Sequence, residues 1–407
     1  MREGYKKTEI GVIPEDWEVK KLEDICEFLD GRRKPIKAFD RENIKGDIPY
    51  YGASGIIDWI NDYIFDEDII LLGEDGENLK SRNVPLAFKV TGKCWVNNHA
   101  HVLKPKKDNI DFVTEILESK DYTPYVIGSA QPKLTQAECR KIKIQVPPLK
   151  EQEKIAEILS TVDSQIDDTE KLIEKSKELK KGLMQKLLTK GIGHSEFKKT
   201  GVGEIPVSWE VKKLSELTNK ITDGSHSSPI PVDDSNYKIC TVANMRKNTL
   251  DISSATNISK EDYEKLINNG CYAENGDVLL SKDGTIGKTI LYSQENEKIV
   301  LLSSIAILKP MKEKLRGEYL NQYLQDSRTL TRIVNTKTGS AIKRIVLRDI
   351  NSLKIVVPKL KEQEKIAKIL LSVDNEIEEY ENKKQRLEYL KKGLMQQLLT
   401  GKIRTII

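Results

Sequence analysis

"LKEQEKIAEIL" begins at Leu149, and "LKEQEKIAKIL" begins 211 positions later at Leu360, with ten of the eleven residues identical. Both stretches carry apolar residues at helical spacing among many charged ones. A charged helix that recurs almost unchanged within one chain indicates a common set of contacts in two places, and internal repeats are the first feature to test in a sequence. The chain is therefore expected to be a duplicated unit.

The repeat extends well beyond this helix. "IPEDWEVKKLED" around Trp17 recurs as "IPVSWEVKKLSE" around Trp209, and "LKKGLMQKLLTKG" from Leu179 recurs as "LKKGLMQQLLTGK" from Leu390. The offset is 192 residues at the tryptophans and 211 residues at the helices, so the second globular part is 19 residues longer while the helices keep one length. We predict two globular parts and two long helices, with boundaries at 1–148, 149–190, 191–358 and 359–407.

Apolar residues alternate three and four positions apart along both helices, which is the heptad pattern of a coiled coil. Thr169, Ser176 and Lys384 weaken this seam toward its far end, and Gly191 and Gly401 follow the last turns. Because a globular part separates the helices in sequence, we expect an antiparallel pair; a helix that covers only its own globular part is the alternative. The predicted packing residues are Ile155, Leu159, Val162, Ile166, Ile173, Ile366, Leu370, Val373, Ile377 and Leu387.

Composition limits the classes of protein to consider. The 407 residues include 67 Lys and Arg against 63 Asp and Glu, so any DNA-binding surface must be a local basic patch on a nearly neutral body. No apolar run approaches the roughly 18 residues of a membrane span, and the first residues lack the apolar core of a signal peptide. Five scattered cysteines without a CxxC pair indicate reduced thiols, and we expect a prokaryotic cytoplasmic protein.

Both globular parts have the pattern of mixed α and β structure. Short strand candidates such as "DEDIILLG" and "GDVLLS" are separated by Gly, Asn or Asp turns, and "NIDFVTEILESKDY" and "EYLNQYLQDSRTLTRIV" read as helices. The irregular alternation favours a twisted sheet over a doubly wound nucleotide-binding fold. The predicted fold class is α+β, with two duplicated domains separated by two long antiparallel coiled-coil helices in a pseudo-twofold arrangement.

The IPxxWEVKKL entry, the "PPLKEQEKIAEILSTVD" helix and the "LKKGLMQKLLT" helix end resemble the specificity subunit of type I restriction-modification systems, over the whole chain. The resemblance implies two target-recognition domains that each read one half of a split DNA sequence, with helices that set the spacing. It further implies docking of two methyltransferase subunits, which nuclease-translocase subunits join. "IPYYGASGIIDWI" and "ITDGSHSSPIP" resemble two different types of recognition domain, so the two half-targets are expected to differ.

Two motifs suggest other chemistry and fail on detail. "SKDGTIGKT" is similar to a phosphate-binding loop, but that pattern needs a glycine where Lys282 stands. "NNHAH" places His99 and His101 on one face of a strand without a third metal ligand nearby. Neither a methyltransferase motif nor a glycine-rich cofactor loop is recognisable, so we expect a non-catalytic subunit with no cofactor and no metal.

Sequence-specific reading of DNA requires Arg, Lys, Asn or Gln side chains at base edges and further polar groups at phosphates. Polar loops and turns of both globular parts supply such side chains, although surface loops are polar in any protein. The candidates are Tyr50, Tyr51, Ser54, Lys80, Arg82, Asn98, His99, Gln131 and Lys133 in the first part, and His226, Ser227, Lys282, Ser303, Ser304, Lys343 and Arg344 in the second.

Two other functions are compatible with the pattern alone. A coiled-coil adaptor that holds two protein ligands apart needs no DNA, and shift of duplex DNA in the presence of the methyltransferase subunit separates it from a specificity subunit. An autonomous enzyme is disfavoured by the missing motifs, and cofactor binding to the isolated chain tests it.

Overall fold

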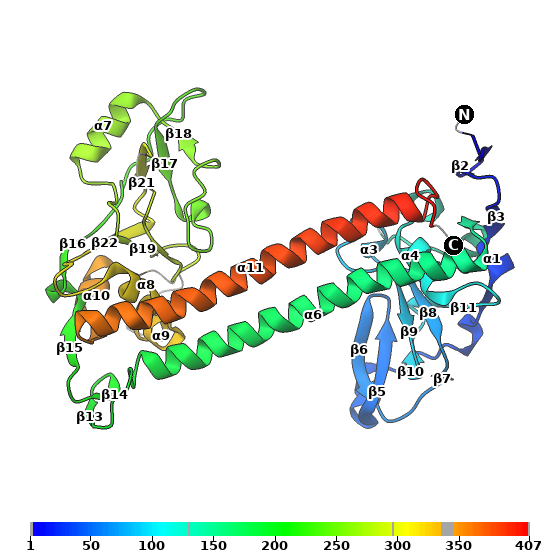
Figure 1. Cartoon of the computed structure of the whole chain (residues 1–407), viewed down its shortest axis with the longest axis horizontal. Coiled ribbons are helices and arrows are strands. Elements are labelled where there is room, and N and C mark those ends of the chain that lie inside the picture. The colour runs from blue at the N-terminus through cyan, green and yellow to red at the C-terminus, as the bar shows by residue number, and fades with distance from the viewer. Residues whose placement is uncertain (1–2, 129–130, 295–296, 335–344, 406–407) are drawn as a thin grey trace. The chain divides into compact units, whose positions relative to one another are not determined.

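The structure is a computed structural model that describes residues 3–128, 131–294, 297–334 and 345–405 (Figure 1). The chain divides into two compact units. Unit 1 consists of Met1–Lys171 together with Glu381–Ile407, and unit 2 consists of Leu172–Tyr380. Each unit thus contains one globular part and a portion of both long helices, which excludes the alternative in which a helix serves only its own globular part.

Unit 1 contains two four-stranded sheets. A small apolar cluster lies between them, and the main core packs the other face of one sheet against helices. The recognition sheet, as we name it here, has the order β4-β11-β8-β9, and the other has the order β6-β5-β10-β7. Their strands are β4 (Cys26–Phe28), β5 (Lys45–Gly52), β6 (Gly55–Ile60), β7 (Phe65–Asp66), β8 (Ile69–Gly73), β9 (Ala87–Val90), β10 (Lys93–Val96) and β11 (Ala100–Pro105). Strand β8 is buried throughout, as its uninterrupted apolar sequence predicts.

Short elements close the remaining faces of unit 1. The strand β3 pairs with β12 in an antiparallel two-stranded sheet, and the β1–β2 hairpin precedes them. Helix α4 begins where the Asn109 side chain accepts a hydrogen bond from Phe112 N at 3.0 Å. The bounds are β1 (Tyr5–Thr8), β2 (Gly11–Pro14), β3 (Glu18–Lys21), α1 (Leu22–Ile25), α2 (Ala38–Glu42), α3 (Asn78–Ser81), α4 (Ile110–Glu118), α5 (Gln136–Lys141) and β12 (Lys143–Val146), with 3₁₀ turns at Asp30–Arg32 and Thr123–Tyr125.

Unit 2 repeats this topology on a diverged sequence. Its recognition sheet has the order β16-β22-β19-β20, its strand β15 pairs with β23, and β13 pairs with β14. A three-stranded sheet, β18-β17-β21, takes the place of the second sheet of unit 1. The strands are β13 (Phe197–Thr200), β14 (Gly203–Pro206), β15 (Glu210–Lys213), β16 (Thr218–Asp223), β17 (Lys238–Cys240), β18 (Thr256–Asn257), β19 (Val278–Ser281), β20 (Thr289–Leu291), β21 (Ile299–Leu301), β22 (Ile305–Pro310) and β23 (Lys354–Val357).

The helices of unit 2 differ from the prediction at one point. The stretch expected as a single helix forms two, because the backbone is extended at Asp326 (ψ 123°). Helix α7, which starts with the Ser259 side chain as its N-cap, has no counterpart in unit 1 and belongs to the longer second part. The bounds are α7 (Lys260–Asn268), α8 (Gly317–Gln325), α9 (Ser327–Val334) and α10 (Leu347–Ser352), with 3₁₀ turns at Leu214–Glu216 and Val242–Asn244.

The long helices α6 (Leu149–Leu187) and α11 (Leu360–Leu398) each contain 39 residues and run antiparallel within each unit. In unit 1, Lys391 Nζ lies 2.7 Å from Asp163 Oδ2, and Lys384 contacts Glu170 farther along α6. In unit 2, Lys180 of α6 lies 2.6 Å from Asp374 of α11. Later residues of α6 therefore contact earlier residues of α11, which shows that the two helices run in opposite directions.

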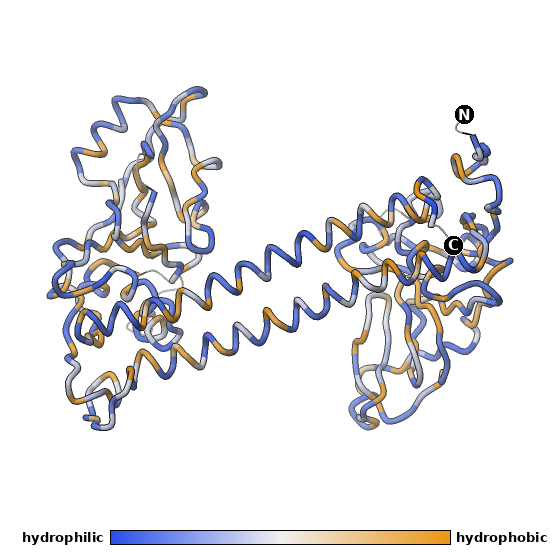
Figure 2. Tube along the Cα trace, in the orientation of Figure 1, coloured by the Kyte–Doolittle hydropathy of each residue, from blue (hydrophilic) through white to orange (hydrophobic). Residues whose placement is uncertain are grey.

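Burial follows the predicted seam of both helices. Ile155, Leu159, Ile366 and Leu370 are completely buried, and hydrophobic residues alternate with hydrophilic ones along both helices in Figure 2. The core of unit 1 contains Leu159 together with Leu398 from the end of α11. Among the other predicted packing residues, Val162, Ile173, Val373, Ile377 and Leu387 are buried and Ile166 is half-buried.

The repeated sequence motifs contact one another. Glu151, which is 1% exposed, accepts a hydrogen bond from the indole of Trp17 at 3.0 Å, and Glu362 accepts one from Trp209 at 2.9 Å. The next residue, Gln152 or Gln363, donates to a proline carbonyl at 2.9 Å. The "KEQEK" sequence is therefore the same in both copies because its second and third residues, Glu and Gln, join each helix to the globular part that precedes it.

The glycines that end the helices complete the same two joints. Gly401 has a φ of +68° and Gly191 a φ of +65°, the left-handed conformation expected at a helix end. A Cβ on Gly401 would lie 2.5 Å from Pro14, and one on Gly191 would strike Trp209. Each joint thus combines one tryptophan, the start of one long helix and the end of the other.

Candidate nucleic-acid interface

In unit 1, three loops meet at one end of the recognition sheet: the segment after β4, the segment after β8 and the turn before β11. Glu74 N, after β8, donates to His99 O, before β11, at 2.9 Å. The Gln131–Leu134 segment belongs to the same set, because Leu134 N donates to Glu74 O at 2.7 Å. The end of β5, which leads into the β5–β6 turn, also joins them because Asn97 N donates to Tyr51 O at 3.0 Å. We call this set of loops the loop face of unit 1.

Several predicted DNA-contacting residues lie together on this loop face. His99 is exposed, and its Nδ1 lies 2.8 Å from Asp75 Oδ2. Lys133 is exposed and lies 3.1 Å from Glu74 Oε1. The remaining exposed candidates of this face are Ser54, Asn98 and Gln131.

Other candidates of unit 1 are engaged in the protein itself. Tyr50 is 1% exposed, and its hydroxyl accepts a hydrogen bond from Ile36 N at 2.9 Å, so we withdraw it as a DNA contact. Tyr51 is half-buried and tilted against Phe88, and burial raises the pKa of its hydroxyl. These two tyrosines fill the core that the sequence "IPYYG" enters as a strand.

Helix α3 carries two further candidates after β8. Lys80 is exposed. Arg82 is half-buried with a left-handed backbone (φ 52°), and its guanidinium donates to Glu118 Oε1 at 3.0 Å. Glu118 also accepts from Leu86 N and Ala87 N, each at 2.8 Å, so Arg82 belongs to a structural network.

The sequence analysis missed the network of charges beneath the loop face. Asp30 and Glu74 are both 8% exposed, and Arg33 lies between them, 3.4 Å from Asp30 and 2.5 Å from Glu74. His101 is fully buried, with Nδ1 2.7 Å from Asp30 Oδ2 and Nε2 2.8 Å from Leu134 O. Burial raises the pKa of Asp30, but the hydrogen bond and charge of His101 outweigh it, and the pKa is below its ordinary value. The signal in the sequence was "DGRRKPIK", in which a buried acid precedes four basic residues, three of which, Arg32, Lys34 and Lys37, are exposed.

In unit 2, the equivalent loops bring the predicted residues together at the same end of the sheet. Ser303 N donates to Ser225 O at 2.8 Å, and Lys282 N donates to Ser304 O at 3.0 Å. His226 is exposed, with Nε2 3.2 Å from Asp223 Oδ1. Ser227 is exposed, and Ser303 and Ser304 are half-buried.

Lys282 was predicted to reach DNA, and the structure places it elsewhere. Its side chain is only 4% exposed, and its Nζ lies 2.5 Å from Asp223 Oδ2. The ion pair offsets the cost of removing both charges from water. If Lys282 turned outward, the Asp223 carboxylate would remain buried without its partner, so Lys282 stays in the interior. Lys343 and Arg344 lie outside the described residues.

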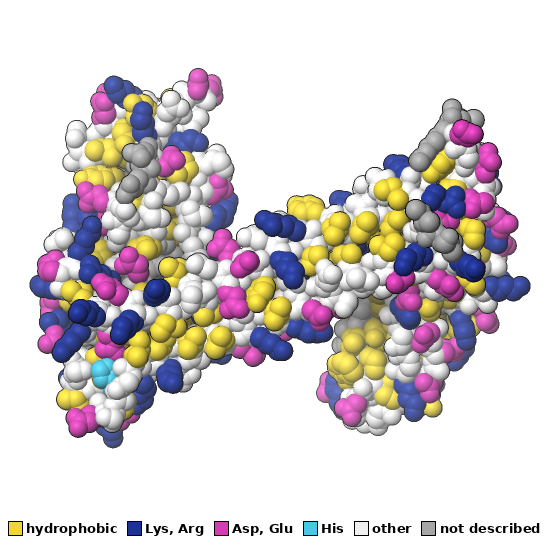
Figure 3. Space-filling view, in the orientation of Figure 1, with side chains coloured by type: hydrophobic (Ala, Val, Ile, Leu, Met, Phe, Trp, Pro, Cys, Tyr) yellow, Lys and Arg dark blue, Asp and Glu magenta, His cyan; other side chains and the backbone are white. Residues whose placement is uncertain are grey.

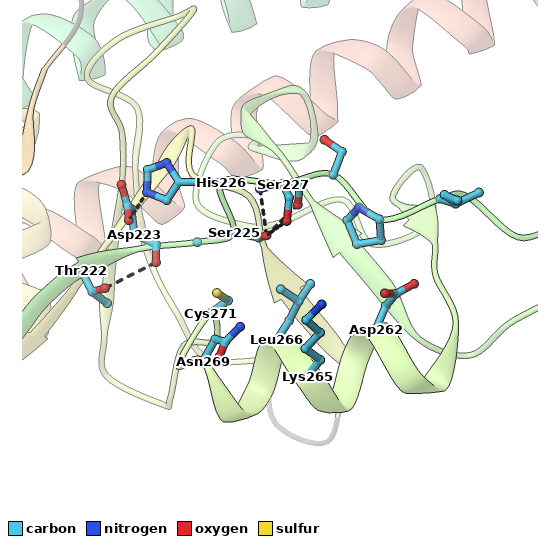
Figure 4. A pocket seen from close by; sticks show the side chains of 14 residues that line it. Thr222, Asp223, Ser225, His226, Ser227, Asp262, Lys265, Leu266, Asn269 and Cys271 are labelled. Atoms are coloured by element: carbon cyan, nitrogen blue, oxygen red, sulfur yellow. Dashed lines mark hydrogen bonds and ion pairs between the residues drawn. The ribbon is translucent and has the colours of Figure 1, made fainter.

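A cleft of about 650 Å³ opens beside this loop face in unit 2 (Figure 4). The "TDGSHSSPI" segment forms one wall, and α7 forms the other with Asp262 and Lys265, followed by its C-cap residue Asn269. The side chains that line it are of mixed charge. The cleft therefore adds polar groups from α7 to those of the loops.

Neither of the two motifs that suggested other chemistry forms the site it resembles. The "SKDGTIGKT" segment connects the antiparallel strands β19 and β20, and no helix follows it to present its N-terminus to a phosphate. His101 is occupied by Asp30 and Leu134, while His99 is on the surface with Asp75. Within the described part of the chain, no group of three potential metal ligands is present.

Comparison with known proteins agrees with this arrangement. The family described as "Type I restriction modification DNA specificity domain" matches residues 14–180 and again residues 206–389. The chain belongs to this family. It is 31% identical to the putative type I restriction enzyme MjaX specificity subunit of Methanocaldococcus jannaschii, over 99% of this chain and 97% of that one. It is 28% identical to a putative type I restriction enzyme specificity subunit of Haemophilus influenzae, over 87% of this chain and 86% of that one.

The fold agrees as well. The crystal structure of the type I restriction-modification S subunit from M. genitalium superposes with a TM-score of 0.63 at 13% identity, covering 94% of this chain and 96% of that one. As a type I specificity subunit, the chain recognises DNA sequence within a restriction-modification complex and is itself non-catalytic. The adaptor that binds no DNA is not favoured. In the described residues, no helix is both long and apolar enough to cross a membrane.

Proposed function

We propose that the loop face of each unit reads one half of a bipartite DNA target, and that the two halves differ in sequence. One observation carries this proposal: the same sheet end presents different side chains in the two units. His99 and Lys133 are exposed in unit 1, whereas His226 and Ser227 are exposed in unit 2. Because base edges are read by the chemistry of such side chains, different sets select different bases.

We further propose that α6 and α11 set the spacing between the half-targets and dock two methyltransferase subunits, which nuclease-translocase subunits join. Adenine methylation and ATP-dependent cleavage then belong to the complex. Support comes from the equal length of the two helices and from the near identity of their starts, which a common partner requires. The predicted boundaries at 1–148, 149–190, 191–358 and 359–407 are kept in this proposal, with the helices in the second and fourth segments.

The location we propose is the cytoplasm, where host and incoming DNA are both accessible. All five cysteines are buried and unpaired, which suits a reducing compartment. Burial raises the pKa of the Cys26 thiol to about 12 and that of Cys240 to about 12, so both remain neutral thiols.

The experiment is methylome sequencing of a strain that expresses this chain with its methyltransferase and nuclease subunits. The expected result is one bipartite motif with two dissimilar halves and an unspecified gap. A second strain carries one extra heptad in both helices. At about 1.5 Å per residue this lengthens each helix by about 10 Å, which corresponds to roughly three base pairs of DNA. A gap that widens with unchanged halves supports the spacing role, and a motif without a gap contradicts the proposal.

A further inference from the structure

A buried aspartate stands at the same place in both recognition sheets. In unit 1, Phe28 pairs with Leu103 of β11, and Asp30 follows two residues later. In unit 2, Ile221 pairs with Leu308 of β22, and Asp223 follows two residues later. The two aspartate side chains are 4% and 9% exposed, and each is followed by glycine. A carboxylate that is removed from water in both units must be compensated in both.

In unit 1, the compensation comes from β11 and from the loop after β4. His101 of β11 lies 2.7 Å from Asp30, and Arg33 lies between Asp30 and Glu74. The second ring nitrogen of His101, Nε2, lies 2.8 Å from Leu134 O. His101 thus connects the loop after β4 with the Gln131–Leu134 segment.

In unit 2, the compensation comes from a different loop. The position of His101 is held by Ala306, opposite the same point of β19, and the position of Glu74 is held by Lys282. Lys282 Nζ lies 2.5 Å from Asp223, and its carbonyl accepts a hydrogen bond from Ile345 N at 3.0 Å. Unit 1 thus has an acidic residue, Glu74, where unit 2 has a basic one, Lys282. It has His101 where unit 2 has the apolar Ala306.

We propose that Asp30 with His101 in unit 1, and Asp223 with Lys282 in unit 2, are positioning pairs that fix the DNA-reading loops without touching DNA. This inference rests on the proposed function. Each pair joins the end of the first strand of the sheet to a second segment that carries candidate DNA contacts. In unit 1 His101 contacts Leu134, which is adjacent to Lys133, and in unit 2 Lys282 N donates to Ser304 O. The pairs differ in composition, but each contacts the segment that precedes a short helix near the end of its globular part, through Leu134 in unit 1 and Ile345 in unit 2.

Burial separates this role from direct contact. His101 is completely buried and Lys282 is 3% exposed, so neither presents a charged group to a phosphate. Charged hydrogen bonds in the interior are stronger than those on the surface, and a partner left alone pays the cost of desolvation. Loss of one pair is therefore expected to release loops rather than to remove a base contact.

The test uses His101→Ala in the full chain, assembled with its methyltransferase subunit, on duplexes with either half-target scrambled. The expected result is about a tenfold weaker selection of the half read by unit 1, from loss of one charged hydrogen bond, with unchanged selection of the other half. Lys104→Ala is the matched control, because it removes a half-exposed ion pair with Glu67 at 2.6 Å on the same strand. Hydrogen exchange of β8 and β11 reports whether the sheet stays folded.

A second variant tests the exchange of partners between the units. Arg33→His, Glu74→Lys and His101→Ala together give unit 1 the residues of His226, Lys282 and Ala306. Recovery of selection in this triple variant supports the inference. Full selection by His101→Ala, loss of exchange protection throughout the sheet, or no recovery in the triple variant would each overturn it. A wild-type complex without a bipartite motif refutes the proposed function instead, so the two failures are distinguishable.

Discussion

Glu151→Ala tests the joint between helix α6 and the globular part of unit 1. Glu151 is 1% exposed and accepts hydrogen bonds from Trp17 Nε1 at 3.0 Å and from Arg404 at 2.8 Å. The substitution leaves the buried indole N–H without an acceptor, which costs about 1–3 kcal/mol. Arg404 keeps Asp16 and is 38% exposed, so its lost contact adds less than about 1 kcal/mol.

We expect Glu151→Ala to destabilise unit 1 by about 2 kcal/mol, which is roughly 30-fold in the folding equilibrium. Because a chain of two units does not unfold in one step, the measurement is amide exchange resolved along the chain, with urea as the perturbant. Amides of β3 and β12 should lose protection while those of unit 2 keep it. Glu362→Ala should produce the reverse pattern, through Trp209.

Two variants make this prediction refutable. Glu153→Ala changes an exposed residue of the same charge one position beyond Gln152, and it should leave exchange unaltered. Glu151→Gln keeps an oxygen for Trp17 but loses the charge facing Arg404, and it should have an intermediate effect. If Glu151→Ala and Glu153→Ala are indistinguishable, the hydrogen bond to Trp17 does not hold the joint and the explanation of the repeated sequence is wrong.

Three further predictions concern stability. Leu159→Ala should cost about 2–5 kcal/mol, because Leu159 is fully buried in the core of unit 1; a loss too small to resolve in urea melts would show that the site collapses or is not packed. Gly401→Ala should destabilise unit 1 by more than about 1 kcal/mol, since its φ is +68° and a Cβ would strike Pro14, whereas Gly393→Ala, whose Cβ meets nothing, should stabilise α11 by up to about 1 kcal/mol; thermal melts of the pair check the contrast. The pKa of Asp30 is lowered on folding, so its contribution to stability is complete above its unfolded pKa of about 3.9 and is lost as the pH falls through the folded value; urea melts from neutral to acidic pH should lose less stability in Asp30→Asn, and an equal loss contradicts the assignment.

The duplication and the strands that it repeats were predictable because they depend on local patterns. The heptad spacing of Ile155 and Leu159 placed both in the interior, and "DEDIILLG" contained the buried strand β8. The direction of the helix pair followed from the globular part between the helices. The second residue of "KEQEK", Glu151, was visible as a repeated residue, but its partner Trp17 is 134 positions away, and no local rule connects them.

The candidate site was less predictable because polarity alone does not distinguish surface from buried charge. Lys282 was predicted as a DNA contact because it stands in a polar stretch, but it is buried against Asp223, which is far away in sequence. The partner that buries His101, Asp30, is equally distant. Tyr50 was also predicted as a DNA contact and is buried, since an aromatic residue in a strand can either fill a core or face a ligand. Ion pairs across loops decide these cases, and they depend on tertiary structure.

The first and last segments of the chain belong to one unit, and this has a consequence for synthesis on the ribosome. Residues of unit 2 end at Tyr380, whereas unit 1 needs Leu398 in its core and Gly401 beside Tyr5, whose hydroxyl donates to the Gly401 carbonyl at 2.8 Å. Domains generally fold as they emerge from the ribosome, which adds about 5–20 residues per second. The portion translated first is thus the portion completed last: its apolar interior stays uncovered while more than half of the polypeptide is still being made.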